Sequence, residues 1–340
     1  MDPLLPIGKL PIDLLTRLLA RAPVQDPRVL LGPGVGMDCA VIALDDRCLV
    51  IKSDPITFAT DEIGWYLVQV NANDIATTGA LPRWLMLTML LPEQQATEKM
   101  VDEISEQVYR ACKEFGISVI GGHTEITHGL SRPILLGTMI AEIEQEKLVT
   151  PQGAAPGDRI LLTKGVPIEA TALVAREFGS LLQNVLSAEQ LAQARDYLHK
   201  PGISVLQDAQ VAIKAGKVTA MHDPTEGGLS AALWELAEAS GRSLFIDVEA
   251  VPVPEIAASV CQALDLNPLE SIASGALILT APADGAEKIR RALAAEGIDC
   301  AEIGEVRAGP AQVWQRSASG ETRLPRPERD AITRLYEKRL

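Results

Sequence analysis

Acidic side chains recur at places where a predicted strand of this chain passes into a turn, and several of them stand beside glycines. The segments are 32–40, 51–55, 120–125 and 222–229, and a further polar group lies at 69–74. Carboxylates gathered from several segments repel one another and raise one another's pKa unless cations lie between them. Mg²⁺ prefers oxygen ligands and is commonly bound by a few carboxylates together with phosphates. These residue types therefore predict a site for Mg²⁺ and a phosphorylated nucleotide.

The first segment places alternating glycines before an acidic residue. Gly34 and Gly36 are followed by Asp38, and glycines let the backbone approach a ligand closely. The pattern matches neither a P-loop nor a dinucleotide-binding fingerprint. Gly34, Gly36 and Asp38 are therefore candidate ligand-binding residues, and an ordinary tight hairpin entry is the alternative.

The second and third segments add a lysine and a polar helix. Side chains alternate along a strand, so Lys52 and Asp54 share one face. They could hold a phosphate and its metal, or form a surface ion pair that contributes little. Gln69, Asn73 and Asp74 stand within a predicted helix that is otherwise apolar and therefore buried. Buried polar groups need partners or a metal, so this group indicates a functional site or a satisfied polar network in the core.

A predicted buried strand, 117–120, ends in two glycines that three polar residues follow. Such a position at the carboxyl end of a strand favours phosphate or metal binding. The histidine could be a metal ligand, a hydrogen-bond donor or a structural residue. The candidates are Gly121, Gly122, His123, Thr124 and Glu125.

In the second half of the chain, a predicted strand leads through an acidic loop into a predicted helix. Asp223 or Thr225 could cap this helix. Gly227 and Gly228 stand at its start, where free backbone N–H groups form an anion-binding position.

The elements that must position these residues alternate between strand and helix, which predicts an α/β or α+β protein. In the first half we expect strands at 39–44, 48–53, 85–91, 117–120 and 134–141, and helices at 62–78 and 97–115. The small, Gly- and Pro-containing stretch 151–158 predicts a linker, with a domain boundary near residue 150. Beyond it we expect strands at 160–163, 218–221, 243–248, 276–280 and 301–306, and helices at 168–178, 188–199, 203–215, 228–239, 254–264 and 283–296.

Composition limits the function classes. The 340 residues carry a formal charge of −14 and are 47% hydrophobic, which argues for a folded protein without a nucleic-acid or anionic-membrane partner. No apolar run approaches the roughly 20 residues that span a bilayer. The first residues lack a signal-peptide pattern, and the five cysteines form no C-x-x-C pair. A reduced, cytoplasmic setting is the expectation.

Taken in order, five motifs resemble those of the AIR synthase superfamily, and most closely its HypE branch of hydrogenase maturation factors. They are GVGMDCAV, KSDPITF, NANDIATTGALP, VIGGHTE and MHDPTEGGL. The resemblance covers about residues 8 to 310. It implies a PurM-like fold with an N-terminal domain (1–150) that pairs through its sheet as a homodimer, and a C-terminal domain (151–340) that closes over ATP sites near the interface.

The resemblance also implies roles for individual residues. Asp38, Asp54 and Asp74 match acidic positions of the family, of which the last binds Mg²⁺. Gly121 and Gly122 match its Gly-Gly turn. The second-domain loop is matched by Asp223, Thr225, Gly227 and Gly228.

Two positions depart from the family pattern. His123 stands where several members carry an acidic residue, so one metal ligand is expected either to be missing or to be replaced by Glu125. HypE proteins end in a cysteine that carries the carbamoyl group, whereas this sequence has its last cysteine at Cys300 and ends at Leu340. The cyanide-ligand chemistry of hydrogenase maturation is therefore not expected to run in its known way.

Two functional hypotheses follow. In the first, the chain is a Mg²⁺-ATP-dependent enzyme acting on a small molecule. Its metal ligands would be Asp38, Asp54 and Asp74. Its phosphate and nucleotide contacts would include Lys52, Asn73 and the glycine turns. Its catalytic candidates would be Asp74, Lys52, His123 and Glu125. In the second, it is a non-catalytic ATP-binding assembly factor with a protein partner in a maturation pathway.

Overall fold

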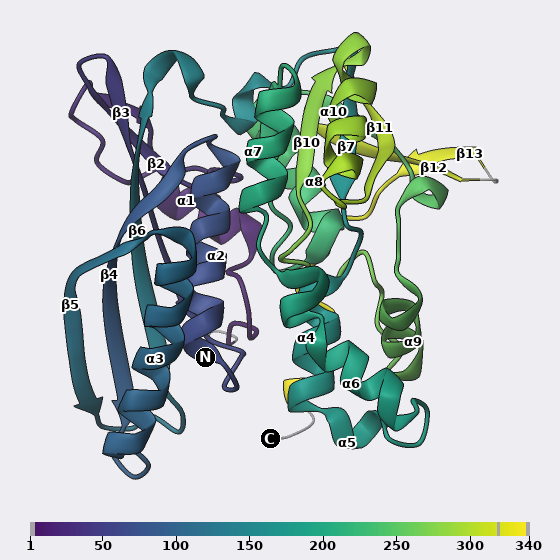
Figure 1. The fold of residues 1–340 in the computed structure, drawn as a ribbon. Coiled ribbons are helices and arrows are strands. Elements are labelled where there is room, and N and C mark those ends of the chain that lie inside the picture. Colours follow the sequence, from purple (N-terminus) through teal and green to yellow (C-terminus); the bar gives the residue numbers. More distant parts are fainter. Residues whose placement is uncertain (1–3, 318–319, 338–340) are drawn as a thin grey trace. The chain divides into compact units, whose positions relative to one another are not determined.

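The computed structural model describes residues 4–317 and 320–337, and their contacts divide them into two units. The small unit holds residues 26–31 and 38–148, and the large unit holds the remaining described residues. Residues 4–25 and 32–37 thus belong to the large unit although they precede the predicted boundary. Each unit has one sheet with helices (Figure 1), so the predicted mixed α/β class is confirmed.

The small unit is built on a six-stranded sheet in the order β1-β2-β3-β6-β4-β5. Only β4 and β5 pair in parallel; the other neighbours are antiparallel. The strands are β1 (Val29–Leu31), β2 (Ala40–Leu44), β3 (Arg47–Ile56), β4 (Leu81–Pro92), β5 (Ser118–Thr127) and β6 (Ile134–Glu144).

Two helices pack on this sheet. All residues of α2 (Ile63–Thr77) are buried, as its apolar sequence predicts, and α2 contacts β3, β6 and α3 (Glu98–Phe115). Two glycines make this close packing possible. A Cβ at Gly137 of β6 would lie 2.8 Å from the Asn71 side chain, and one at Gly64 would lie 2.7 Å from the carbonyl oxygen of Ile104.

Apolar side chains remain exposed on β4, β5 and β6. Strands with one buried and one open face alternate in exposure, and β4 and β6 show this alternation. The exposed apolar residues are Leu81, Met86, Val119, Ile120, Ile126 and Leu136.

The prediction of a buried strand that ends at residue 120 is wrong. β5 continues through both glycines to Thr127, lies at the edge of the sheet (Figure 1) and is exposed over almost its whole length. The strand continues because the register shifts by one residue at Ile120, a β-bulge after which Gly121 and Gly122 pair with β4. Gly122 has a φ of +146°, and a Cβ there would lie 1.7 Å from the Leu87 carbonyl oxygen.

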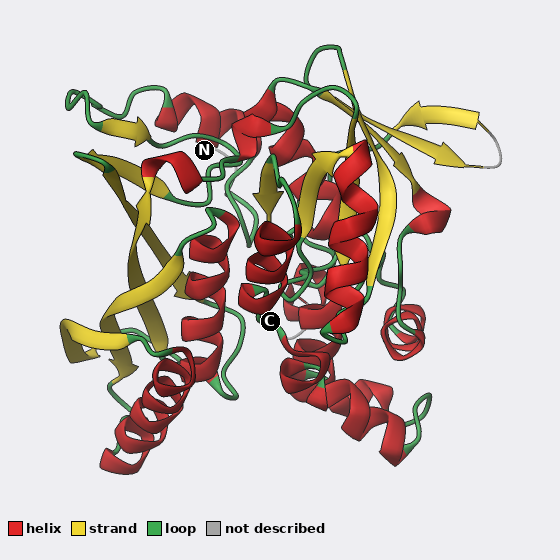
Figure 2. Ribbon diagram, turned by 45° about the horizontal axis from the view of Figure 1, so that its top comes forward, coloured by secondary structure: helices red, strands yellow, loops and turns green. Residues whose placement is uncertain are grey.

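The large unit is built on a seven-stranded sheet in the order β13-β12-β9-β11-β7-β10-β8. Its strands are β7 (Asp158–Thr163), β8 (Ala220–His222), β9 (Ser243–Asp247), β10 (Ile278–Pro282), β11 (Cys300–Arg307), β12 (Gln312–Ser317) and β13 (Gly320–Arg323). β12 and β13 form a ribbon that extends from the sheet (Figure 2).

The helices of the large unit are α1 (Ile12–Leu19), α4 (Ile168–Glu177), α5 (Gly179–Leu182), α6 (Ala188–Asp196), α7 (Leu206–Ala215), α8 (Gly228–Ser240), α9 (Glu255–Ala263), α10 (Ala283–Ala295) and α11 (Thr333–Glu337). Ile160 and Leu162 of β7 pack in one core cluster with α8. Leu161 points to the opposite face and is also fully buried, so both faces of the sheet are covered. None of the described helices is both long and apolar enough to cross a membrane.

We predict that Gly122→Ala destabilises the small unit more than Gly121→Ala does. Both positions have a positive φ, which costs a non-glycine residue about 1–3 kcal/mol. Only Gly122 also approaches a backbone carbonyl, whereas a Cβ at Gly121 would meet nothing within 4 Å. Urea unfolding and hydrogen exchange of the β4–β5 amides measure the difference. Equal losses of stability in the two variants would contradict the close approach of Gly122 to the Leu87 carbonyl.

Candidate functional site

The structure brings Lys52, Asp54 and Asp74 together. The Lys52 Nζ atom lies 3.1 Å from Oδ1 of Asp74 and 3.2 Å from Oδ2 of Asp54. Lys52 and Asp54 share one face of β3, as their spacing predicts, and Asp74 extends from α2. Side-chain exposure is 3% for Asp74, 18% for Lys52 and 32% for Asp54. The group is therefore embedded in the small unit and still reachable at Asp54.

The charges of this group determine its protonation. Burial by itself lowers the pKa of Lys52. The charge of Asp74, followed by those of Asp54 and Asp38, more than offsets this and raises the pKa well above its usual range. Asp38 of the glycine segment is thus part of the same electrostatic group. The ammonium stays charged at any physiological pH.

Two side chains, Asn71 and Cys39, hold the backbone around these carboxylates through three hydrogen bonds. The Asn71 side chain accepts a hydrogen bond from the Asp54 N–H at 3.0 Å and donates one to the Leu67 carbonyl at 2.9 Å. The Cys39 thiol donates to the Asp74 carbonyl at 3.2 Å. Asn71 was not among the predicted site residues, although it shares with Asn73 the signal of an amide inside a buried helix.

His123, Thr124 and Glu125 lie elsewhere in the small unit. They belong to β5, which β6 and β4 separate from β3. His123 Nε2 and Glu125 Oε2 are 3.1 Å apart, and both side chains are at least half exposed. Hydrogen bonds from His123 and Thr127 lower the pKa of Glu125. Within one chain the structure does not bring these residues to Lys52.

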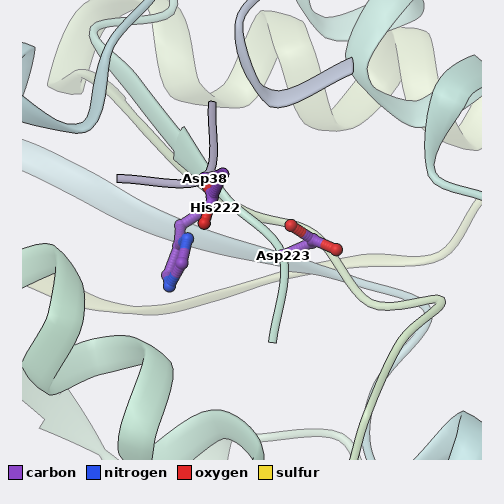
Figure 3. A group of neighbouring side chains, drawn as sticks. All are labelled: Asp38, His222 and Asp223. Atoms are coloured by element: carbon purple, nitrogen blue, oxygen red, sulfur yellow. The ribbon is translucent and has the colours of Figure 1, made fainter. Parts of the chain in front are cut away.

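In the large unit, His222 and Asp223 stand at the end of β8 and are buried (Figure 3, which also draws Asp38). A ligand atom of His222 and one of Asp223 lie within 4.8 Å of each other. His222 Nε2 is 2.9 Å from Oε2 of Glu235 on α8. Burial raises the pKa of Glu235, but the Lys9 charge and the His222 contact reverse this and lower it overall. Glu235 is therefore ionised.

The start of α8 already has acceptors for its N–H groups. Gly227 donates to Asp330 Oδ2 at 2.6 Å, Gly228 to the Thr225 carbonyl at 2.9 Å, and Ser230 to the Leu269 carbonyl at 2.8 Å. An anion bound at this helix start would have to displace Asp330. Gly228 has a φ of +60°, and a Cβ there would lie 2.6 Å from a carbonyl oxygen of the 269–271 segment.

The glycine segment before Asp38 packs closely against α8 within the large unit. Gly36 has a φ of +71°, and a Cβ there would lie 2.4 Å from the Glu235 carbonyl oxygen. A Cβ at Gly34 would meet only the Met37 side chain, at 3.0 Å. The close packing against α8 thus explains why position 36 requires a glycine.

Sequence reasoning missed Lys9, Glu235 and Asp330. Lys9 donates a hydrogen bond to the Thr225 hydroxyl at 3.0 Å and pairs with Glu226 and Glu235. Lys9 and Asp330 reach the loop from distant parts of the chain, so no local pattern indicated their roles. Glu235 lies on the helix that follows the loop, 13 residues after His222.

Comparisons with known proteins agree with this architecture. The family models of the AIR synthase related protein match its N-terminal domain at residues 36–143 and its C-terminal domain at residues 155–315. The carbamoyl dehydratase HypE of Azotobacter vinelandii is 30% identical over 270 residues, which cover 78% of this chain and 74% of that protein. A thiamine-monophosphate kinase of Pyrococcus horikoshii is 27% identical, covering 65% of this chain and 68% of that protein.

Solved structures share the fold. HypE in complex with ATP has a TM-score of 0.69 and 24% identity, covering 92% of this chain and 90% of that one. A thiamine monophosphate kinase structure, AaThiL with AMPPCP and TMP, has a TM-score of 0.71 and 20% identity, and the match covers 94% of this chain and 95% of that one. At these identities the likeness shows the two-domain PurM-like fold. With both domain models matched and a HypE protein 30% identical over most of its length, the chain belongs to the AIR synthase-related family and is a HypE-like member of it.

Proposed function

We propose that this protein is a Mg²⁺-ATP-dependent enzyme that phosphorylates a small molecule, or activates an amide-type group through a phosphorylated intermediate. The observation that carries the proposal is the gathering of Asp38, Asp54 and Asp74 around one charged lysine. The relative named as a thiamine-monophosphate kinase supports phosphorylation of a small molecule, and the one named as a carbamoyl dehydratase supports activation of an amide-type group.

The residues present fit a magnesium ion. All three acidic side chains offer carboxylate oxygens, which Mg²⁺ prefers, and Asp54 keeps a third of its surface open. Asp38, Asp54 and Asp74 would hold the ion, and the ion would neutralise charge on the phosphates. One lysine balances only part of the negative charge of three carboxylates, so the group retains an attraction for a divalent cation.

The chain's own residues would then orient the nucleotide. Lys52 holds its proton and can contact a phosphate oxygen, stabilising the charge that develops there. Asn71 fixes the backbone of Asp54, which keeps that carboxylate in place. Asn73 and the Asp223–Thr225 loop are proposed as further nucleotide contacts, with Gly227 and Gly228 shaping that loop. Most of the rate enhancement would come from positioning.

We propose that a second copy of this chain covers the exposed face of β4, β5 and β6. Contiguous exposed apolar side chains mark interaction surfaces, and Met86, Ile120 and Ile126 are each at least 45% exposed. In such a homodimer, the partner's sheet would shield β5. His123 and Glu125, which lie apart from Lys52 within one chain, are then proposed to act at or near the dimer interface.

A second candidate function is a non-catalytic ATP-binding maturation factor. It is favoured by the relatedness to hydrogenase maturation proteins and by the solved complex of HypE with HypF. Binding of Mg²⁺-ATP without ADP formation across candidate substrates would distinguish it from the enzyme.

We predict that Asp74→Asn removes the Mg²⁺ dependence of ATP binding. The substitution keeps the size of this buried side chain but removes the anionic oxygen. A ligand that binds only the folded state stabilises it by RT ln(1 + [L]/Kd), where [L] is the free ligand concentration. Thermal unfolding with a non-hydrolysable ATP analogue, with and without Mg²⁺, should therefore show a Mg²⁺-dependent shift in the wild type and little in the variant.

The matched control for this experiment is Asp102→Asn, on the exposed side of α3 in the same unit. It should keep the full Mg²⁺-dependent shift. ADP release measured in parallel should fall by about two orders of magnitude in Asp74→Asn. A variant that retains both readouts would remove Asp74 from the metal site.

We predict that Lys52→Met destabilises the protein and that Mg²⁺ restores most of the loss. Removing one partner of a buried ion pair costs about 3–5 kcal/mol, because the remaining charges lose their compensation. A divalent cation can replace the missing charge, so Mg²⁺ should raise the melting temperature of this variant more than that of the wild type. Lys99→Met, which removes a largely exposed i,i+4 pair, should change stability by less than about 1 kcal/mol. An equal Mg²⁺ effect on all three proteins would refute the compensation.

A further inference from the structure

Lys9 stands in the segment before α1 and reaches the loop before α8, and both belong to the large unit. Its ammonium nitrogen lies 3.0 Å from the Thr225 hydroxyl oxygen, 3.5 Å from Oε1 of Glu235 and 3.6 Å from Oε2 of Glu226. An ammonium group has three N–H donors and no acceptor, so each of these oxygens can receive one of them. Lys9 and Thr225 are 216 residues apart in the chain.

Polar contacts, more than burial, hold this segment on the loop. Residues 4–10 are all exposed, and α1 has no buried residue. Gly8 has a φ of +113°, and a Cβ there would lie 3.7 Å from the Thr333 side chain, so the segment passes close to α11. Asp330, just before α11, accepts the N–H of Gly227. Segments from both ends of the chain therefore hold the loop.

The contact with Lys9 leaves the Thr225 hydroxyl with its own O–H to donate. A hydroxyl has one donor and two lone pairs, and an ammonium can only donate, so Lys9 uses a lone pair of Thr225. Thr225 is only partly buried. The N–H groups of Gly227 and Gly228 already have acceptors within the protein. The hydroxyl is thus a donor that the loop can offer to a ligand.

Glu226 and Glu235 keep the ammonium in place. Glu235 faces Lys9 with Oε1, and its Oε2 lies 2.9 Å from Nε2 of His222. Burial raises the pKa of Glu235, and the Lys9 charge is the largest of the influences that lower it again. The ammonium in turn offsets part of the negative charge beside the loop, which reduces the repulsion that a phosphate would meet there.

We propose that Lys9 is a positioning residue for the nucleotide: by donating to the Thr225 hydroxyl oxygen, it directs the Thr225 O–H toward a phosphate oxygen. The inference rests on the proposed function, in which the Asp223–Thr225 loop contacts the nucleotide. A phosphate oxygen is an anionic acceptor, and a hydrogen bond to a charged group contributes more than one between neutral groups. In this arrangement Lys9 acts through Thr225 and does not itself contact the ligand.

A double-mutant cycle of Lys9 and Thr225 tests the inference. Calorimetry gives the Kd of a non-hydrolysable ATP analogue with Mg²⁺ for the wild type, Lys9→Met, Thr225→Val and the double variant. Lys9→Met should raise this Kd by about tenfold, as expected for one hydrogen bond to a charged group. Thr225→Val should raise it by at least as much. The double variant should bind no more weakly than Thr225→Val, because the hydroxyl through which Lys9 acts is then absent.

Two control variants accompany the cycle. Thr225→Ser keeps the hydroxyl, so Lys9→Met should still raise the Kd by about tenfold in that background. Lys288→Met removes an exposed lysine of α10 in the same unit and should leave the Kd unchanged. Because residues 4–10 are exposed, unliganded Lys9→Met should melt close to the wild type. If it does not fold, Lys9→Ala takes its place in the cycle.

The outcomes separate this inference from the proposed function. A Kd that Lys9→Met leaves unchanged overturns the inference alone, even where the variant melts earlier. An equal effect of Lys9→Met in the wild-type and Thr225→Val backgrounds also overturns it, because Lys9 would then act on the ligand independently of Thr225. If the wild type does not bind the analogue with Mg²⁺, the proposed function fails and the inference fails with it.

Discussion

The small unit depends on keeping several carboxylates ionised in a partly buried place. Like charges at short range favour protonation, which would remove the ligands that a cation needs. Lys52 prevents this, because its ammonium lies within 3.2 Å of two of the carboxylates and its own pKa is raised by them. The lysine offsets part of the negative charge of these carboxylates, and in the proposed function it would contact a phosphate once a cation shares that task.

This arrangement requires α2 to lie very close to the sheet. Asp74 can reach Lys52 because α2 packs directly on β3 and β6, where Gly137 leaves room for the Asn71 side chain. Asn71 then ties α2 to the backbone of Asp54. The polar residues of a helix that is otherwise apolar therefore connect the helix to the strand that carries the other charges.

Much of this could be predicted from local patterns. The predicted helices 62–78 and 97–115 correspond to α2 and α3, since apolar spacing, the Thr97 cap and the terminal Gly116 are local signals. The strand ending at residue 120 was wrong because two adjacent glycines usually stop a strand, whereas here a bulge and the close approach to Leu87 require them. Lys9 and Asp330 could not be predicted, because their partners lie more than 100 residues away in the chain.

The two units bury acidic groups by opposite means. In the small unit a lysine keeps the acids charged, which suits a cation and phosphates. In the large unit, burial and neighbouring acids raise the pKa of Glu169 and Asp330 to about 8 and about 7. A buried acid without a cation beside it is stabilised by protonation, whereas one beside an ammonium is stabilised by the opposite charge.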